Sequence, residues 1–289
     1  VDGDRDVPGI RAAGENFQVI IEEGGKITGT DVTHTPRLHL IDATSEGSGE
    51  IIVRGALDAA GYRAKGIYAR NGVKKITVTE SGTIGVQGRP YYPDGLRLQG
   101  SSITLDMRGT VEVRGEVPIG VALEEGATAT ISGEIRALGH RPIGIAVGST
   151  SIQGSEVILS GSIIADGEEA EAIRFGSGQG YRLELHPTFS ITGDGSAQSE
   201  SSLLAFGGFD GFGEGIFDLN QLGRDRFSDR QYRGFGQIEK VGSSTWTLQG
   251  DALGDFTTSI HEGRLNVNGS LAGAVTVKAG GTLGGTAHG

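Results

Sequence analysis

The stretch that decides the fold is residues 95–123, which read GLRLQGSSITLDMRGTVEVRGEVPIGVAL. Apolar and polar residues alternate in three short runs of it, around Leu96-Arg97-Leu98, Ile103-Thr104-Leu105 and Val111-Glu112-Val113. The motif that opens the stretch, glycine followed by two apolar residues around a variable one, returns at its end. Alternation with a period of two is typical of β-strands, and runs this short and this broken by glycine do not fit helices. The stretch therefore predicts three strands in one repeat.

The opening motif recurs along the first two-thirds of the chain. Counted between the first apolar residues, the steps are 28, 29, 29, 25, 24, 28 and 30 residues, and such near-constant spacing indicates a repeat architecture. Three strands in 24–30 residues match one coil of a parallel β-helix, because leucine-rich repeats need a leucine and asparagine signature and propeller blades need about 40 residues. The eight occurrences are Gly9-Ile10-Arg11-Ala12, Arg37-Leu38-His39-Leu40, Gly66-Ile67-Tyr68-Ala69, Gly95-Leu96-Arg97-Leu98, Gly120-Val121-Ala122-Leu123, Gly144-Ile145-Ala146-Val147, Ala172-Ile173-Arg174-Phe175 and Ser202-Leu203-Leu204-Ala205.

Two further sets of alternating runs lie between these occurrences. One coil cannot bury its own apolar residues, but stacked coils hydrogen-bond at about 4.8 Å spacing and align like residues inside the column. We therefore predict an all-β chain that folds as a right-handed parallel β-helix with three strands per coil and about ten or eleven coils. The second set includes Val19/Ile21, Ile51/Val53, Ile76/Val78, Ile103/Leu105, Ala129/Ile131, Val157/Leu159 and Leu183/Leu185, and the third includes Ile84/Val86, Val111/Val113, Ile135/Ala137, Ile163/Ala165 and Phe189/Ile191.

Composition excludes several classes of function. The 289 residues include 52 glycines and no cysteine, so disulfides, thiolate metal sites and a cysteine nucleophile are ruled out. A formal net charge of −11 argues against binding to nucleic acid, because phosphate contacts need a basic surface. No apolar window reaches about 18 residues, so we expect no membrane insertion, and Val1 opens a polar stretch that does not resemble a signal peptide. The chain is expected to be cytosolic or a fragment of a longer exported protein.

The repeat breaks after Phe206. Residues 207–235 are rich in phenylalanine and carry the charged run Arg224-Asp225-Arg226. This segment could offer exposed aromatic anchors to a partner. It could also close the column where the regular coils meet a different terminal unit, and the strand-like run Ile216-Phe217-Asp218-Leu219 favours closure.

The last segment carries a specific order of motifs. It contains Gln237-Ile238-Glu239-Lys240, Ser244-Thr245-Trp246-Thr247-Leu248, Gly263-Arg264-Leu265-Asn266-Val267 and Ala279-Gly280-Gly281-Thr282-Leu283. In order and spacing it resembles the autochaperone, or passenger-associated transport repeat, of the Gram-negative type V (classical) autotransporters, although Asp255-Phe256-Thr257-Thr258-Ser259 replaces the usual threonine-rich stretch. The predicted division is 1–206 regular coils, 207–235 aromatic-rich junction and 236–289 autochaperone segment, with a C-terminal autochaperone cap. The resemblance implies a folding core of Trp246, Leu248, Leu265, Val267, Leu271 and Leu283 as packing residues and Gly263, Gly269, Gly280 and Gly281 as turns.

The resemblance also implies a location and partners. In that family a passenger is exported through the periplasm and outer membrane, its C-terminal segment emerges first, and each coil then templates the next. This chain is accordingly read as a passenger fragment at the bacterial cell surface or secreted, separate from its own β-barrel translocator. The implied role is an adhesin- or virulence-type stalk whose partner is a host surface protein or glycan, or a second copy of itself.

The residues offer little for catalysis. The glutamate pairs Glu22-Glu23, Glu124-Glu125 and Glu168-Glu169 lie at strand ends or corners, where the two side chains point to opposite faces, so we interpret them as solvated. The histidines have no metal-ligand spacing, and we expect no catalytic residues, no metal, no cofactor and no enzyme activity. A polysaccharide-cleaving enzyme, with two or three converging carboxylates, and a passive spacer for an upstream domain remain alternatives.

The corner at Gly88 to Asp94 is the best place for a ligand. Its residues Arg89, Tyr91 and Tyr92 combine basic and aromatic character, which suits a sugar or a protein surface. The same tyrosines could simply cover the column. These three residues are the candidate ligand-binding residues of the sequence.

Overall fold

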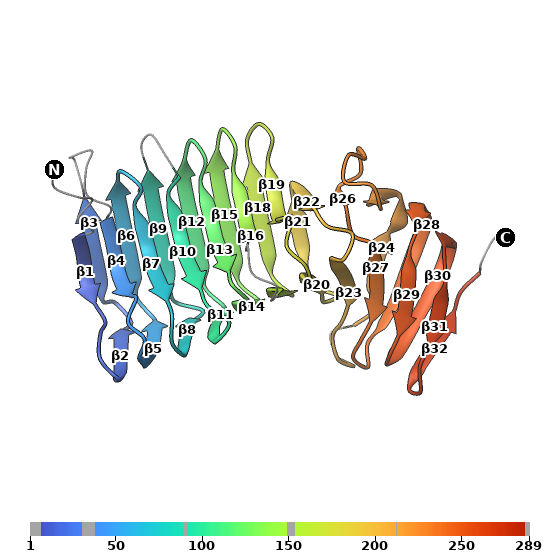
Figure 1. Cartoon of the computed structure of the whole chain (residues 1–289), viewed down its shortest axis with the longest axis horizontal. Helices are drawn as coiled ribbons and strands as arrows, with labels where there is room; N and C mark the ends of the chain where they lie inside the picture. Colours follow the sequence, from blue (N-terminus) through green and yellow to red (C-terminus); the bar gives the residue numbers. More distant parts are fainter. Residues whose placement is uncertain (1–6, 31–37, 89–91, 149–153, 212, 287–289) are drawn as a thin grey trace.

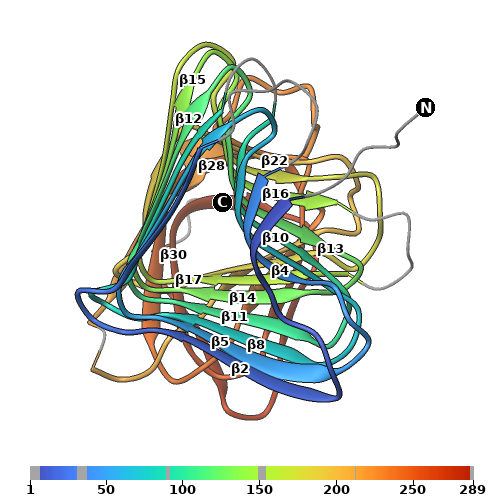
Figure 2. The ribbon, with the colours of Figure 1, turned by 90° about the vertical axis from the view of Figure 1, so that its left-hand side faces the viewer.

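A computed structural model describes residues 7–30, 38–88, 92–148, 154–211 and 213–286. It contains three sheets, and each is built of parallel strands stacked along the column (Figure 1). Sheets A, B and C form the three sides of a column, which Figure 2 shows from its N-terminal end. Every strand pair in the three sheets is parallel, so the predicted parallel β-helix is confirmed. The 11 strands of sheet B, about one per coil, match the predicted coil number.

The strands of each sheet come from successive coils. Sheet A, including β24 beside β28, contains β1 (Val7–Arg11), β4 (Leu38–Ala43), β7 (Lys65–Arg70), β10 (Asp94–Gln99), β13 (Ile119–Glu124), β16 (Ile143–Gly148), β19 (Glu171–Phe175), β22 (Asp194–Ala197), β24 (Gly215–Asp218), β25 (Leu222–Gly223), β26 (Tyr232–Arg233), β28 (Thr245–Asp255), β30 (Gly263–Ala272) and β32 (Gly281–Gly284). Sheet B contains β2 (Asn16–Ile21), β5 (Ser48–Val53), β8 (Lys74–Val78), β11 (Ile103–Met107), β14 (Thr128–Ile131), β17 (Glu156–Leu159), β20 (Arg182–Leu185), β23 (Leu203–Phe206), β27 (Gln237–Lys240), β29 (Thr257–Ile260) and β31 (Val275–Val277). Sheet C contains β3 (Lys26–Thr30), β6 (Ala56–Gly61), β9 (Thr83–Gly88), β12 (Thr110–Gly115), β15 (Glu134–Gly139), β18 (Ser162–Asp166) and β21 (Ser190–Thr192), and a 3₁₀ turn η1 spans Leu219–Gln221.

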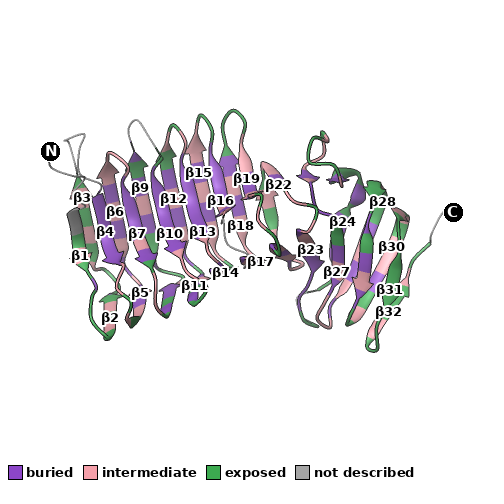
Figure 3. Cartoon of the chain, viewed as in Figure 1, coloured by how far each residue is buried: buried purple, intermediate pink, exposed green. Residues whose placement is uncertain are grey.

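Like residues stack inside the column, as expected from the alternation. Ile67, Leu96, Val121 and Ile145 occupy one register position in consecutive strands of sheet A, and all four are fully buried. Figure 3 shows this buried band along the middle strands. None of the described residues forms a helix long and apolar enough to cross a membrane.

Four predicted registers are wrong. Ile10 pairs with Ile41, so the motif at Leu38 is displaced by three residues. Leu203 lies in β23 of sheet B, where it pairs with Arg182, although its motif placed it in the first set. Period-two alternation also cannot distinguish a shift by two residues, because such a shift leaves the same residues pointing inward. The other two shifts are of that kind, since Leu105 rather than Ile103 pairs with Ile76, and Ile191 rather than Phe189 pairs with Ile163.

The glycine of the repeated motif has a steric reason. A Cβ added to Gly120 would lie 2.5 Å from the Gly144 carbonyl oxygen of the next coil, and Gly66 and Gly95 meet the following coil in the same way, at 2.6 and 2.5 Å. A side chain at these three glycines would crowd the neighbouring coil. Not every coil needs the glycine, because the buried Leu40 before Ile41 and the buried Ala172 before Ile173 hold the same position.

The column changes its cross-section near its C-terminal end. Sheet C ends at β21, whereas sheets A and B continue across both predicted domain boundaries, so the predicted three-part division stays a prediction. Strand β28 pairs with β24 on one side and with β30 on the other. These two long strands take over the side that sheet C forms in the regular coils (Figures 1 and 2).

The junction 207–235 contributes both buried and exposed aromatic residues. Phe217 and Tyr232 are buried, and their rings lie 5.1 Å apart between centroids. The Phe206 ring packs against the rings of Phe217 and Trp246, with centroids 5.0 and 4.9 Å away, and so joins the regular coils to the C-terminal segment. Phe209 and Phe227 are exposed, so the closure interpretation fits only part of this segment.

The C-terminal segment places its predicted packing residues at different depths. Trp246, Leu248 and Leu265 are fully buried, and Val267 and Leu271 are half-buried against the core. Leu283 is 46% exposed on β32, where no further coil follows it among the described residues, so its packing role stays a prediction.

The four predicted turn glycines also differ from one another, here in backbone conformation. Gly263 and Gly280 have φ angles of 70° and 98°, a conformation that glycine adopts without strain. Gly269 lies inside β30 and is not a turn, whereas Gly281 closes a turn before β32, because its N–H donates to the Lys278 carbonyl oxygen at 3.0 Å. A Cβ at Gly269 would lie 1.9 Å from the Gly250 carbonyl oxygen, so close approach of the neighbouring strand is its reason.

Two buried lysines hold corners of the column. Lys240 Nζ donates to the carbonyl oxygens of Val241, Gly242 and Glu262 at 2.6, 2.6 and 3.2 Å. Lys74 Nζ donates to four corner carbonyls in the same manner, among them that of Ser45 at 2.7 Å. Each ammonium group satisfies carbonyls that a tight corner leaves without strand partners.

Candidate functional site

The outer face of sheet A carries a recurring pair of polar positions. In β10 both Asp94 and Arg97 point outward, and Arg97 Nε donates to Asp94 Oδ2 at 2.8 Å. In β19 Glu171 and Arg174 do the same, with Arg174 Nη1 donating to Glu171 Oε2 at 3.1 Å. The strand pairing leaves out the small residue that follows the acidic one, Gly95 in β10 and Ala172 in β19. The acidic residue and the arginine three positions later therefore lie on the same face of the sheet.

The carboxylate of the first pair is sealed from solvent. Asp94 is fully buried and also accepts a hydrogen bond from Lys65 Nζ, while Arg97 reaches on to Glu124 in the next coil. Burial acts to raise the pKa of Asp94, but the charges of Lys65 and Arg97 outweigh it and lower the pKa overall. With no access for a ligand, this cluster is a structural feature.

His39 and Asp42 extend the cluster toward the N-terminus. Both are buried, His39 Nδ1 lies 3.6 Å from Asp42 Oδ2, and the His39 ring meets the Tyr68 ring edge-on at 4.9 Å between centroids. Burial acts to raise the pKa of Asp42, but the neighbouring polar groups of His39 and Thr44 and the charge of Arg11 lower it overall. This pair is also closed to solvent and offers no binding site.

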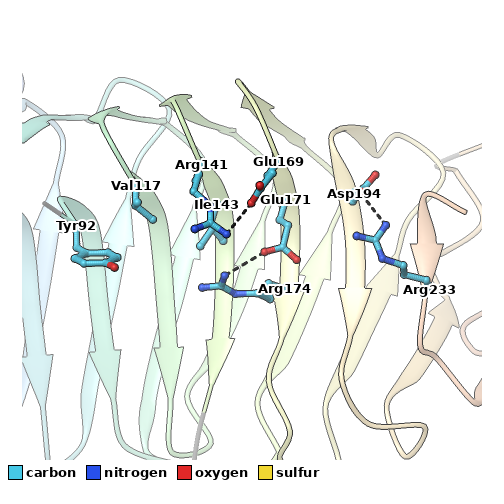
Figure 4. A pocket seen from close by; sticks show the side chains of 9 residues that line it. All are labelled: Tyr92, Val117, Arg141, Ile143, Glu169, Glu171, Arg174, Asp194 and Arg233. Carbon is cyan, nitrogen blue, oxygen red and sulfur yellow. Dashed lines mark hydrogen bonds and ion pairs between the residues drawn. The ribbon is translucent and has the colours of Figure 1, made fainter. Parts of the chain in front are cut away.

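The second pair opens into a groove of about 580 Å³ (Figure 4). The groove runs between the outer face of sheet A and the corners that lead from sheet C to sheet A. Two other hollows, over sheet C and at a sheet A to sheet B corner, measure about 380 and 460 Å³. The lining residues of the groove are Tyr92, Val117, Arg141, Ile143, Glu169, Glu171, Arg174, Asp194 and Arg233.

Three arginine–carboxylate pairs supply the polar groups of the groove. Arg141 Nη2 lies 2.6 Å from Glu169 Oε2, and Arg233 Nη1 donates to Asp194 Oδ2 at 2.6 Å. Glu171 holds the central position, because it accepts from Arg174 and, at 2.7 Å, from Ser196 Oγ. Figure 4 shows the pairs side by side on neighbouring coils.

An apolar floor lies next to these pairs. Ile143 is buried with Ile119 and Ala122 in a small cluster on the outer side of sheet A, separate from the core of the column, and Val117 and Ala146 pack against it. At the far end stands Tyr92, which is 50% exposed. The groove thus combines hydrogen-bonding groups with apolar surface, as small-molecule sites do.

Of the three candidate ligand-binding residues, one reaches this groove. Tyr92 lines it, whereas Arg89 and Tyr91 lie outside the described residues. The interpretation of Glu168-Glu169 as solvated is confirmed, since both residues are exposed, but Glu169 also lines the groove beside Glu171. Glu168 does not line the groove, and its carboxylate lies 3.3 Å from His140 Nδ1.

Sequence reasoning missed most of the groove. The sequence motifs gave no sign of Arg141, Asp194 or Arg233, and Arg174 appeared only as the variable residue of the repeated motif. A signal existed, since an acidic residue, a small residue, an apolar residue and arginine follow one another both at 94–97 and at 171–174. Among the described residues, no three His, Cys, Asp or Glu side chains come together as a metal site.

Comparison with known proteins adds no relative. A scan of protein-family models finds no match to this chain, and neither curated proteins nor solved structures match it. The fold and the groove therefore carry the functional argument.

Proposed function

We propose that this chain is a non-enzymatic passenger of the autotransporter type, a rigid stalk displayed outside the bacterial cell whose C-terminal segment starts the folding of the column. Its proposed partners are a host surface protein or glycan, or a second copy, and its own β-barrel translocator during export. The observation that carries the proposal is the continuous pairing of β24, β28 and β30, tied through Trp246 to Phe206 of the regular coils.

Local pairing supports a folding role for this segment. Strands β28 and β30 pair along most of their length, although only about twenty residues separate partners such as Trp246 and Leu265. Short separation keeps the entropy cost of closure low, so this unit can form before longer-range pairings. Once formed, it offers ladder positions to β24 and β25 through β28, while β29 of the same segment pairs with β27, and these strands continue toward the N-terminal coils.

A matched pair of core substitutions tests the folding order. Leu265→Ala in β30 and Leu96→Ala in β10 remove the same fully buried side chain, and each is expected to destabilise the protein by about 2–5 kcal/mol. If the C-terminal segment nucleates folding, Leu265→Ala slows refolding and Leu96→Ala mainly speeds unfolding. Stopped-flow and manual-mixing circular dichroism measure both rates.

Two outcomes contradict this order. Equal slowing by both variants removes the nucleation role, and slowing by Leu96→Ala alone reverses it. Truncation before Gly236 gives a second readout, because it uncovers Phe206 and Phe217. The proposal would also be refuted if the truncated coils refold to the same circular dichroism signal per residue as the full-length protein.

A polysaccharide-cleaving enzyme is the alternative that the groove raises, since Glu169, Glu171 and Asp194 lie in it together. Glycoside hydrolysis requires one carboxyl group that stays protonated as the acid. Here each of the three carboxylates is already held by an arginine partner. The arrangement thus favours binding over catalysis, and the passive-spacer alternative is tested by the ligand experiment below.

A further inference from the structure

The groove over sheet A has the chemistry of a saccharide site. We propose that it binds a neutral oligosaccharide, whose vicinal hydroxyls bridge the arginine–carboxylate pairs while its C–H faces pack on Tyr92 and the apolar floor. This assignment rests on the proposed non-enzymatic surface role and adds a ligand class to it. Glu171 and Arg174 form the centre of the site.

Unused hydrogen-bonding capacity is the first argument. An arginine has five N–H donors and a carboxylate accepts at about four positions, yet the Arg233–Asp194 and Arg141–Glu169 pairs each have one short contact between their members. Donors and acceptors therefore stand side by side, which is what two adjacent hydroxyl groups need, since each hydroxyl both donates and accepts. Ser196 fixes one oxygen of Glu171, so this acceptor is held in place before a ligand arrives.

The apolar surface is the second argument. Val117 and Ile143 lie at the base of the groove and the half-exposed Tyr92 ring stands at its end (Figure 4). A sugar ring presents hydroxyls at its edge and C–H groups on its faces, so it can use both kinds of surface at once. Tyrosine suits such a contact because its ring is apolar and its hydroxyl is polar.

Charge selects a neutral ligand. The three arginines and three carboxylates of the groove cancel, and the whole chain has a formal net charge of −11. A sulfated or uronic acid polymer would approach against this charge and would find its arginines already paired. A ligand rich in hydroxyls but without charge meets neither obstacle.

Geometry selects a saccharide over a peptide. The strands under the groove, β13, β16, β19 and β22, each have a strand partner on both sides, so no free edge remains for an added peptide strand. The lining from Tyr92 to Arg233 crosses six neighbouring strands, and at about 4.8 Å per strand this is roughly 24 Å. That length admits a chain of several sugar units laid along the column.

The test uses the full chain and defined probes. Maltohexaose, cellohexaose, xylohexaose and mannohexaose are titrated into the protein by calorimetry up to millimolar concentration, with a heparin hexasaccharide, an oligogalacturonate and an unstructured peptide as comparators. At least one neutral hexasaccharide is expected to bind. Glu171→Gln removes the central charge with little change in shape and is expected to weaken binding roughly tenfold or more.

Matched controls separate the site from the fold. Asp106→Asn alters an exposed ion pair on sheet B, where Asp106 lies 3.4 Å from Arg108, and is expected to change affinity by less than about twofold. Circular dichroism checks that each variant is folded. Tyr92→Ala is expected to weaken binding as well.

Three results overturn the site: no neutral hexasaccharide binds, only a charged oligosaccharide or the peptide binds, or Glu171→Gln and Tyr92→Ala both leave the affinity unchanged. Chromatography of the incubated sugars tests the proposed function separately. Cleavage products from a sugar that binds in the groove would refute the non-enzymatic role and leave the site in place. Absence of binding would refute the site and leave the stalk in place.

Discussion

Replacing Trp246 by alanine tests whether the C-terminal segment stabilises the column or merely lies against it. The indole is fully buried between Phe206 and Phe189, with ring centroids 4.9 and 6.1 Å away, and a Cβ on Gly215 would lie 2.4 Å from it. Truncation of a buried tryptophan to alanine costs about 3–5 kcal/mol. The cavity would lie at the joint between the regular coils and the last strands.

The hydrogen bond of the indole adds little to this loss. Trp246 Nε1 donates to the Gly207 carbonyl oxygen at 2.8 Å, but Ser244 Oγ donates to the same oxygen at 2.8 Å. The carbonyl therefore keeps a partner in the variant, and the lost bond accounts for about 1 kcal/mol. We expect about 4 kcal/mol for Trp246→Ala and about 1–2 kcal/mol for Trp246→Phe, which keeps an aromatic ring.

Urea unfolding followed by far-ultraviolet circular dichroism measures these losses, because Trp246 is the only tryptophan and its fluorescence disappears in the variants. The stability of stacked coils is close to the sum of the coil stabilities and of the interfaces between neighbouring coils. The loss of stability should therefore fall on the last coils, where limited proteolysis can locate it. Val277→Ala serves as the control, since Val277 is 46% exposed, with an expected change below about 0.5 kcal/mol. A Trp246→Ala variant within about 1 kcal/mol of the parent, or cleavage that begins in the first coils, would refute the reasoning.

Three further predictions concern the column. Asp94→Asn should lower the free energy of unfolding by about 2–3 kcal/mol at neutral pH, because it leaves Lys65 and Arg97 without their buried anion. The folded-state pKa of Asp94 is lowered, so its contribution to stability is present above the ordinary pKa of 3.8. The difference in stability between the two proteins, measured by urea unfolding, should therefore shrink as the pH falls below 3.8. Gly120→Ala should destabilise by about 1–3 kcal/mol, since its Cβ would meet the Gly144 oxygen at 2.5 Å, and a thermal midpoint equal to that of the parent would contradict the close-approach argument. Burial lowers the pKa of Lys240 to about 8 from 10.5, so the unfolded chain binds more protons than the folded protein between these pH values. The stability of the parent should therefore gain a contribution that rises from about pH 8 to about pH 10.5, and that of Lys240→Met should not. Urea unfolding measures both, and an equal change of stability with pH in the two proteins would contradict the prediction.

Much of the fold follows from alternation and spacing, and its errors have a physical cause. Inward and outward residues alternate with a period of two, so a shift by two, as at Ile103 or Phe189, leaves every apolar residue pointing inward. Only the neighbouring coil decides between such registers. The displacement at Leu38 arose where the coil is longer, since Ile10 pairs with Ile41 across 31 residues.

The groove was harder to predict than the column. Its members come from four corners and four strands, and their meeting depends on the register just described and on the direction in which each corner turns. Glu169 illustrates this, because a corner residue has no fixed period and its side chain could point to either side. Tyr92 was found from its own chemistry, which a corner tyrosine carries without any register.

Burial, rather than the motif, decides what an acidic–small–apolar–arginine run does in this protein. At 94–97 the carboxylate is fully buried and its charges are satisfied within the column, so its loss should appear in stability. At 171–174 the side chains of Glu171 and Arg174 are 21% and 40% exposed, so their ion pair contributes little to stability and remains open to a ligand. Asp94→Asn and Glu171→Gln are therefore near-identical changes with opposite expectations: the first should alter unfolding and leave sugar affinity intact in the folded protein, and the second should alter affinity and leave unfolding nearly unchanged.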